Sequence, residues 1–184
     1  MFEYFPGNYV WNLGVVAALN SGGLIDEVDR ACRPIRELAA QGSDVGTAEL
    51  MASWTAVVDD LQARAERDEA AGHRRAAGQQ YFRATNYLTQ AERMQSAHSP
   101  MRQAIYQRCL DLTQKTFDLL DRATTRVAIP FEGSSLPAYF TAAGRAHPAF
   151  EKRLALCVAW GANHDWGAVQ KRRLEREGER PVPH

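Results

Sequence analysis

The sequence predicts a mainly α-helical fold of about five antiparallel helices, followed by a β-hairpin, one further strand and a C-terminal helix. From residue 9 to residue 125, apolar residues recur at steps of three and four, as on one face of a helix. From Arg126 onward, β-branched and aromatic residues flank turn-forming ones instead. Because 45% of the 184 residues are hydrophobic and 24% charged, the composition is that of a globular protein. We therefore divide the chain into a helical domain, 1–124, and a second segment, 125–184.

Two helical stretches open the chain. The first is expected from residue 9 to residue 20, where Ser21-Gly22-Gly23 would end it. The second covers residues 24–40, but Pro34 lacks a backbone N–H, so we expect a bend near Arg33. The expected apolar faces are Val10, Leu13, Val16, Ala17 and Asn20 in the first stretch, and Ile25, Val28, Cys32, Ile35 and Leu38 in the second.

Three longer amphipathic helices follow. The first two flank Ala71-Gly72 and read as an antiparallel helical hairpin, loosely like one tetratricopeptide unit. Ser99 and Pro100 are typical of a helix start, and the third helix is expected to end near Arg122. The three predicted apolar stripes are Leu50, Trp54, Val57, Leu61 and Ala65; Ala77, Tyr81, Ala84, Leu88 and Ala91; and Met101, Ile105, Leu112, Thr116 and Leu119.

The last third of the chain changes to strand patterns. Residues 125–140 predict a β-hairpin that turns at Glu132-Gly133-Ser134-Ser135. The apolar run LALCVAW, residues 154–160, is typical of a strand buried on both faces, as in parallel sheets. Residues 167–180 are charged and predict the C-terminal helix.

Charge and cysteine content narrow the function classes. With 22 basic and 22 acidic side chains the net charge is zero, so we expect no nucleic-acid partner. The N-terminal residues lack a basic region and a long apolar run, which predicts neither a signal peptide nor a membrane partner. Three cysteines without CxxC spacing indicate reduced thiols. We therefore expect a cytoplasmic protein.

Three segments together resemble a known family: FEYFPGNYVWNLGVVAALNSGGLIDEVDR, DEAAGHRRAAGQQYFRATNYLTQAERM and RVAIPFEGSSLPAYF. The resemblance is to α/β-hydrolases with an N-terminal helical cap, of the 2,6-dihydroxypseudooxynicotine hydrolase and fermentation-respiration-switch esterase type. It implies that the helices form a lid, that the hairpin begins the hydrolase sheet, and that KRLALCVAWGANHDWG contributes a later strand and loop. It also implies a small-molecule ester, amide or ketone substrate cleaved by a serine nucleophile, no cofactor, and a homodimer.

The sequence departs from that family in the segments that hold the family's catalytic residues. Only residues 141–153 separate Phe140 from Leu154, whereas a βαβ unit takes roughly 30 residues. No G-x-S-x-G is present, and the nearest string, Gly42 to Gly46, follows no predicted strand. We therefore expect an internally shortened and truncated relative that keeps part of the sheet, has no catalytic residue and is inactive. The alternative is a non-enzymatic, tetratricopeptide-like binding or assembly module.

Six residues are substrate-pocket candidates: Tyr4, Phe5, Tyr9, Trp11, His164 and Asp165. Aromatic residues beside the Pro6-Gly7 turn suit a loop over an active-site mouth, although aromatics at helical spacing are more often core. His164 and Asp165 follow a strand, where ligand-contacting residues of α/β sheets lie, but Asp165 could simply cap the next helix. The histidines show no HxxxH spacing, so we predict no metal.

Overall fold

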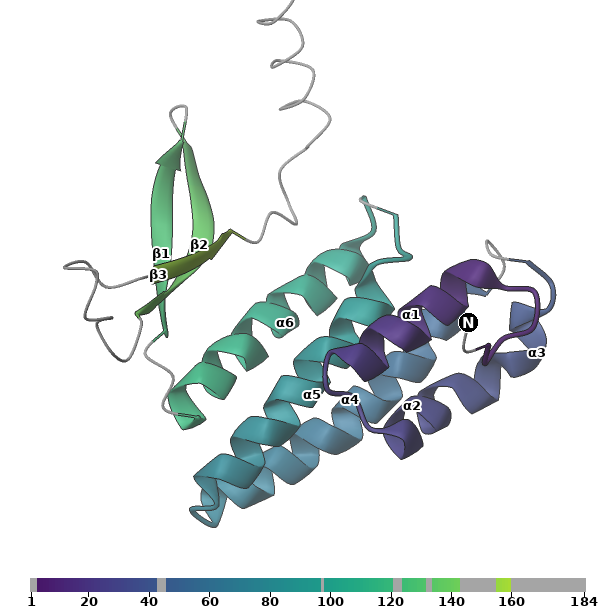
Figure 1. Cartoon of the computed structure of the whole chain (residues 1–184), viewed down its shortest axis with the longest axis horizontal. Helices are drawn as coiled ribbons and strands as arrows, with labels where there is room; N and C mark the ends of the chain where they lie inside the picture. The colour runs from purple at the N-terminus through teal and green to yellow at the C-terminus, as the bar shows by residue number, and fades with distance from the viewer. Residues whose placement is uncertain are drawn as a thin grey trace, which may run out of the picture. The chain divides into compact units, whose positions relative to one another are not determined.

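The computed structural model describes residues 3–42, 46–96, 98–120, 124–131, 134–142 and 155–159. The chain forms two compact units, Met1–Ala123 and Thr124–His184. The first contains helices and the second a small sheet, so the predicted mainly α-helical fold is confirmed (Figure 1). None of the helices in the described ranges combines the length and the hydrophobicity that crossing a membrane requires.

The first unit opens with short helices. They are α1 (Tyr9–Asn20), α2 (Ile25–Cys32), the 3₁₀ turn η1 (Arg33–Ile35) and α3 (Arg36–Ala39). The bend expected near Arg33 is confirmed, because α2 gives way there to a 3₁₀ turn that contains Pro34.

The predicted inner face of α1 is wrong. Its buried side chains are those of Trp11, Asn12, Val15 and Ala18, whereas Leu13 is 38% exposed. Nearly every residue of α1 is apolar, so the spacing of apolar residues fits more than one face. In α2 the buried residues include Val28 and Cys32, but Ile25, also expected inside, is exposed.

The largest part of the core lies between α4 (Thr47–Ala70) and α5 (Arg74–Glu92). These helices form the expected hairpin, and both predicted stripes are buried. The chain reverses at Gly72, whose φ of 82° lies in the left-handed region that favours glycine. The rings of Trp54 and Tyr87 pack across the hairpin, 5.6 Å apart.

Helix α6 (Pro100–Leu119) completes the layer, beside α5 (Figure 1). Ser99 caps it as expected, with its hydroxyl accepting from the backbone N–H of Arg102. The helix ends at Leu119, before the expected Arg122, and Met101 is exposed, contrary to the prediction. A Cβ at Gly78 of α5 would lie 2.7 Å from the side chain of Leu120, so glycine permits this close approach.

The second unit is a three-stranded antiparallel sheet in the order β1 (Thr124–Phe131), β2 (Ser134–Ala142), β3 (Ala155–Ala159). The expected hairpin is confirmed, with Arg126 opposite Tyr139. The run at 154–160 does form a strand, but it pairs antiparallel with β2, so its parallel-type interpretation is wrong. The predicted helix at 167–180 lies outside the described residues.

Candidate functional site

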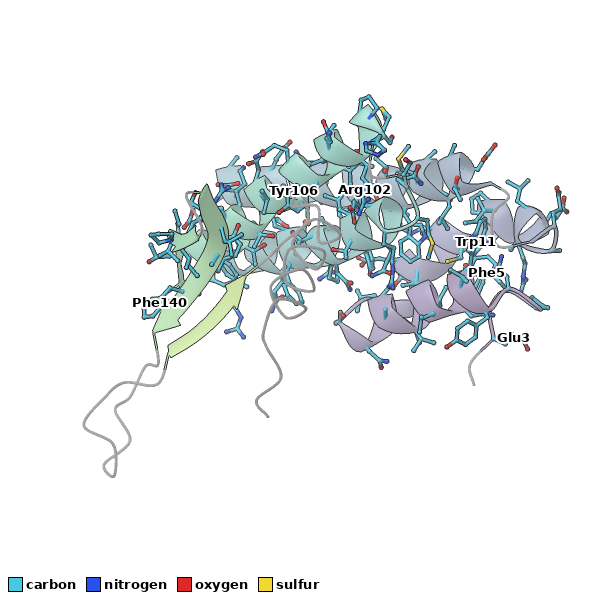
Figure 2. The ribbon with its side chains drawn as sticks, turned by 90° about the horizontal axis from the view of Figure 1, so that it is seen from above. Glu3, Phe5, Trp11, Arg102, Tyr106 and Phe140 are labelled. Atoms are coloured by element: carbon cyan, nitrogen blue, oxygen red, sulfur yellow. The ribbon has the colours of Figure 1, made fainter. Side chains whose placement is uncertain are left out.

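Tyr4, Phe5 and Trp11, three of the predicted pocket residues, lie together at the start of the chain. Figure 2 shows Phe5 beside Trp11. Phe5 is 1% exposed and Trp11 is 2% exposed, and their rings meet edge to face with centroids 5.4 Å apart. The ring of Tyr4 also meets that of Phe5 edge to face, with centroids 5.0 Å apart. Phe5 and Trp11 therefore belong to the core of the helical unit, and Tyr4 borders it.

Two buried asparagines, Asn8 and Asn12, hold this segment in place, and we call them the asparagine clasp. The Asn12 amide oxygen accepts from the backbone N–H groups of Tyr4 and Phe5, at 2.7 and 2.8 Å. Its amide nitrogen donates to the carbonyl of Phe5 at 2.7 Å. Asn8 caps α1 by accepting from the N–H of Trp11, and donates to the carbonyl of Ala39. Neither is among the predicted pocket residues, although Asn8 lies in the loop expected over an active-site mouth. For Asn12, the only signal in the sequence is an asparagine inside an apolar helix.

The hydroxyl of Tyr4 donates to the carboxylate of Asp29 at 2.5 Å. Arg33 also pairs with Asp29, and the guanidinium of Arg36 lies 5.1 Å from the centre of the Tyr4 ring. Burial and the neighbouring Asp29 carboxylate raise the pKa of Tyr4 to about 12. The hydrogen bonds from Tyr4 and Arg33 lower the pKa of Asp29. At neutral pH, Tyr4 is therefore a protonated hydrogen-bond donor.

Of the other predicted pocket residues, the structure describes only Tyr9. Tyr9 is 66% exposed and points away from the core at the first position of α1. His164 and Asp165 lie outside the described residues. The structure thus brings together Tyr4, Phe5 and Trp11 and separates Tyr9 from them.

A buried ion pair joins α2 to α5. The carboxylate of Glu27, a residue 3% exposed, accepts two hydrogen bonds from the guanidinium of Arg83, at 2.9 and 3.2 Å. The hydroxyl of Tyr87 donates to the same carboxylate at 2.7 Å and accepts from the N–H of Leu24. Each partner of this Glu27–Arg83–Tyr87 cluster is thus hydrogen-bonded, as a buried charge requires.

A second polar cluster, Glu69–Tyr81–Lys115, joins α4, α5 and α6. The Tyr81 hydroxyl donates to the Glu69 carboxylate at 2.8 Å, and the Lys115 ammonium donates to both, at 3.1 Å each. Burial raises the pKa of Tyr81 more than Lys115 lowers it. Hydrogen bonds from Tyr81 and Lys115 lower the pKa of Glu69. A Tyr–Lys pair can serve as an acid–base catalyst only where the phenol pKa falls toward neutrality, and here it rises.

The other potentially reactive side chains of the helical unit are not activated either. Burial raises the pKa of Cys32 to about 12 and that of Cys109 to about 11, so neither thiol supplies a thiolate at neutral pH. Burial also raises the pKa of Tyr87. In the described residues, no serine hydroxyl is hydrogen-bonded to the ring of His73 or His98; His73 contacts Asp68 instead, at 3.3 Å. The described ranges also hold no cluster of side chains suited to a metal ion.

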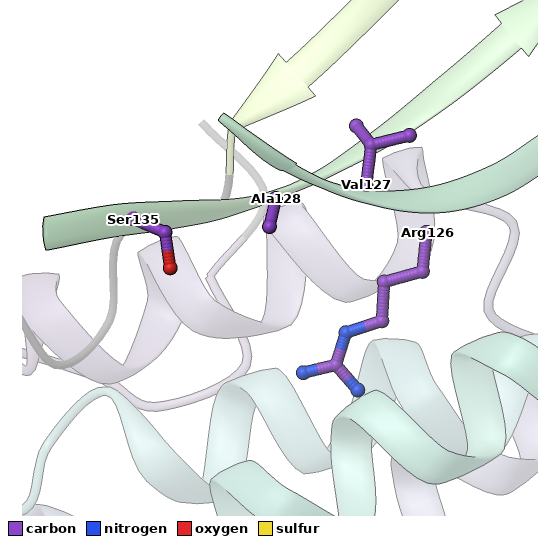
Figure 3. Close-up of a pocket in the computed structure, with 4 residues that line it drawn as sticks. All are labelled: Arg126, Val127, Ala128 and Ser135. Atoms are coloured by element: carbon purple, nitrogen blue, oxygen red, sulfur yellow. The ribbon is translucent and has the colours of Figure 1, made fainter. Parts of the chain in front are cut away.

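A hollow of about 350 Å³ lies on the sheet of the second unit, beside β1 and β2. Arg126, Ala128 and Ser135 point to one side of the sheet, and Val127 points to the other (Figure 3). The lining thus offers one guanidinium and one hydroxyl, enough to contact a polar group but not to activate a nucleophile.

No family model and no curated protein matches this chain. Among solved structures it resembles the crystal structure of the 2,6-dihydroxy-pseudo-oxynicotine hydrolase, with a TM-score of 0.53 and 20% sequence identity. The match covers 74% of this chain and 35% of that chain, so the matched part is about a third of the hydrolase's length. The likeness shows a shared fold with part of an α/β-hydrolase.

Proposed function

We propose that this chain corresponds to the helical cap and the first strands of a hydrolase that cleaves ester, amide or carbon–carbon bonds in small molecules. The observation that carries the proposal is the fold match, which pairs most of this chain with a third of a hydrolase structure. The domain division expected from the sequence, a cap over 1–124 and a partial hydrolase core over 125–184, belongs to this proposal.

The contacts of the helical unit suit a cap rather than a catalytic centre. A cap excludes water and shapes the space over the reacting groups, which requires a rigid scaffold but no titrating side chain. The Glu27–Arg83–Tyr87 cluster joins α2 to α5, and the partly exposed Glu69–Tyr81–Lys115 cluster joins α4, α5 and α6. The asparagine clasp joins the start of α1 to α3. The raised pKa values of Tyr81 and Tyr87 keep these phenols protonated, and the thiols of Cys32 and Cys109 stay neutral. We infer that this chain alone is inactive.

Two experiments test the two halves of this proposal. For inactivity, the purified chain is incubated with p-nitrophenyl acetate, and we expect no turnover above that of buffer. Turnover that a serine-directed inhibitor abolishes would contradict it.

For the cap role, the matched third of the 2,6-dihydroxy-pseudo-oxynicotine hydrolase is replaced by this chain's matched residues. Hydrolysis by that chimera, compared with the same hydrolase lacking the segment, would support the cap role, whereas a folded but inactive chimera would contradict it.

We infer a cytoplasmic location and a small-molecule rather than nucleic-acid or membrane partner. The free, buried thiols of Cys32 and Cys109 support a reducing compartment, and the zero net charge supports the absence of a nucleic-acid partner.

A second candidate function is a non-enzymatic binding or assembly module. The observation in its favour is the number of large apolar side chains left exposed on helices, among them Ile25 at 78% and Tyr9 at 66%. This candidate predicts a monodisperse protein that melts cooperatively and binds a partner saturably. Broad melting together with dye binding to apolar surface would count against it.

A further inference from the structure

The hollow on the sheet of the second unit has a polar side chain at each end and a small apolar one between them. Arg126 and Ala128 belong to β1, two residues apart. Ser135 belongs to β2, where it pairs with Pro130, two residues beyond Ala128. Residues at steps of two along a strand share a face with the residues paired opposite them, so all three line one face of the sheet. Figure 3 shows Ala128 between Ser135 and Arg126, with the guanidinium on the side to which the Ser135 hydroxyl points.

The guanidinium of Arg126 carries a charge that no carboxylate in the described ranges neutralises. Arg83 and Arg102 of the helical unit each pair with a glutamate, whereas the ion pairs and hydrogen bonds of the described residues leave out Arg126. A guanidinium presents its N–H donors as a planar fork, which matches the two oxygens of a carboxylate. The hollow therefore offers this fork to the carboxylate of a ligand.

The remaining lining restricts the ligand further. Ala128 gives the middle of the hollow an apolar floor, which suits a hydrocarbon stem better than a second charge. The hydroxyl of Ser135 both donates and accepts, so it can contact a hydroxyl or a carbonyl group. The volume of about 350 Å³ lies at the lower end of the range for small-molecule sites, roughly 300 to 1,000 Å³.

We propose that this hollow binds a small carboxylic acid in its ionised form. The carboxylate pairs with the Arg126 guanidinium, an apolar stem crosses Ala128, and a hydroxyl or carbonyl group at the far end contacts Ser135. Bidentate pairing fixes the plane of the carboxylate, and the contact with Ser135 fixes the direction of the stem. Because Arg126 and Ser135 are exposed, water weakens both contacts, and we expect a dissociation constant on the order of 1 mM.

The site is tested with para-hydroxybenzoate, which carries a carboxylate, a ring and a hydroxyl in that order. The acid is titrated into the full isotope-labelled chain, and the NMR shifts of the Ala128 and Ser135 backbone amides report binding. Arg126→Gln should raise the dissociation constant at least about tenfold, because it removes hydrogen bonds to a charged group. Arg75→Gln removes a charge from an exposed position of α5, and as the matched control it should change the constant less than about twofold.

Changes to the probe test the same contacts without altering the protein. The neutral amide, para-hydroxybenzamide, should bind at least about tenfold more weakly, because it offers no charge to the guanidinium. Inorganic phosphate, which has the charge but no apolar stem, should also bind more weakly. Benzoate lacks the hydroxyl, so Ser135→Ala should weaken para-hydroxybenzoate by about two- to tenfold and leave benzoate unchanged.

Several results would each overturn the proposal. They are an amide that binds as tightly as the acid, phosphate that binds as tightly as para-hydroxybenzoate, equal effects of Arg126→Gln and Arg75→Gln, and amide shifts that stay constant up to about 20 mM acid. The probe comparisons need no variant, so they decide the matter even if Arg126→Gln disturbs the sheet. Because binding is measured without turnover, the outcome is separate from that of the proposed hydrolase role.

Discussion

Replacing Arg83 by methionine tests whether the Glu27–Arg83–Tyr87 cluster holds α2 on α5. Methionine keeps most of the length of arginine and fills similar space, but it removes both hydrogen bonds to the Glu27 carboxylate. The side chain of Glu27 is only 4% exposed, so water cannot replace the lost partner without opening the contact between the helices. Only the hydrogen bond from Tyr87 would remain.

The expected loss in the free energy of unfolding follows from leaving the buried Glu27 carboxylate without its partner. Breaking a buried ion pair by removing one partner costs about 3 to 5 kcal/mol. Arg83 retains 19% exposure of its side chain, so we expect the lower end, about 3 kcal/mol. The double variant Arg83→Met/Glu27→Gln removes the charge as well, and should recover about 1 to 2 kcal/mol of that loss.

Urea unfolding followed by far-ultraviolet circular dichroism gives the free energy of unfolding of each variant. Arg75→Met is a suitable control, because Arg75 is exposed on the same helix. A loss below about 1 kcal/mol for Arg83→Met, or a double variant as unstable as the single one, would refute the view that an unpaired carboxylate is the cause.

Three further predictions concern the other polar contacts. Because the pKa of Tyr4 is raised, Tyr4 contributes fully to stability below the ordinary tyrosine pKa of 10.0, and this contribution is lost as pH rises toward about 12. Tyr4→Phe should therefore flatten the pH dependence of the unfolding free energy over that interval. The pKa of Glu69 is lowered, so the contribution of Glu69 to stability is present above its ordinary pKa of 4.5 and is lost as pH falls below it. Lys115→Met removes one cause of that lowering, so the unfolding free energy of this variant should depend less steeply on acid pH than that of the wild type. Asn12→Ala leaves the buried N–H of Phe5 and the partly buried N–H of Tyr4 without their acceptor, and should lower the free energy of unfolding by about 2 to 3 kcal/mol. Hydrogen exchange at these two amides should become faster, and unchanged exchange there would contradict the clasp.

The sequence predicted best those helices in which apolar and polar residues alternate clearly. The stripes of α4 and α5 could be identified residue by residue, because most of their outer positions are polar or charged. In α1 the length could be predicted but the inner face could not, since an apolar helix has no polar side to mark its exterior. The strand at Ala155–Ala159 was recognisable from its apolar run, but pairing direction depends on distant segments.

The candidate site was less predictable, because its contacts join residues far apart in the chain. Glu27 and Arg83 are separated by 56 positions, and nothing in either neighbourhood marks them as partners. Asn12 lies in an apolar helix, and only the folded structure shows that it binds the preceding turn. Phe5 and Trp11 were predicted as pocket residues from their bulk and their position in the chain, whereas their burial in the core depends on tertiary packing.

The α4–α5 hairpin, joined by the short turn at Gly72, has a consequence for the order of assembly. Its two helices are neighbours in sequence, so little chain entropy is lost when they meet, and we expect them to associate early. The link from Glu27 to Arg83 closes a much longer loop and should form after the rate-limiting step. Losing that link would then speed unfolding while leaving the refolding rate nearly unchanged, so the Glu27–Arg83–Tyr87 cluster governs how long the folded protein lasts rather than how fast it forms.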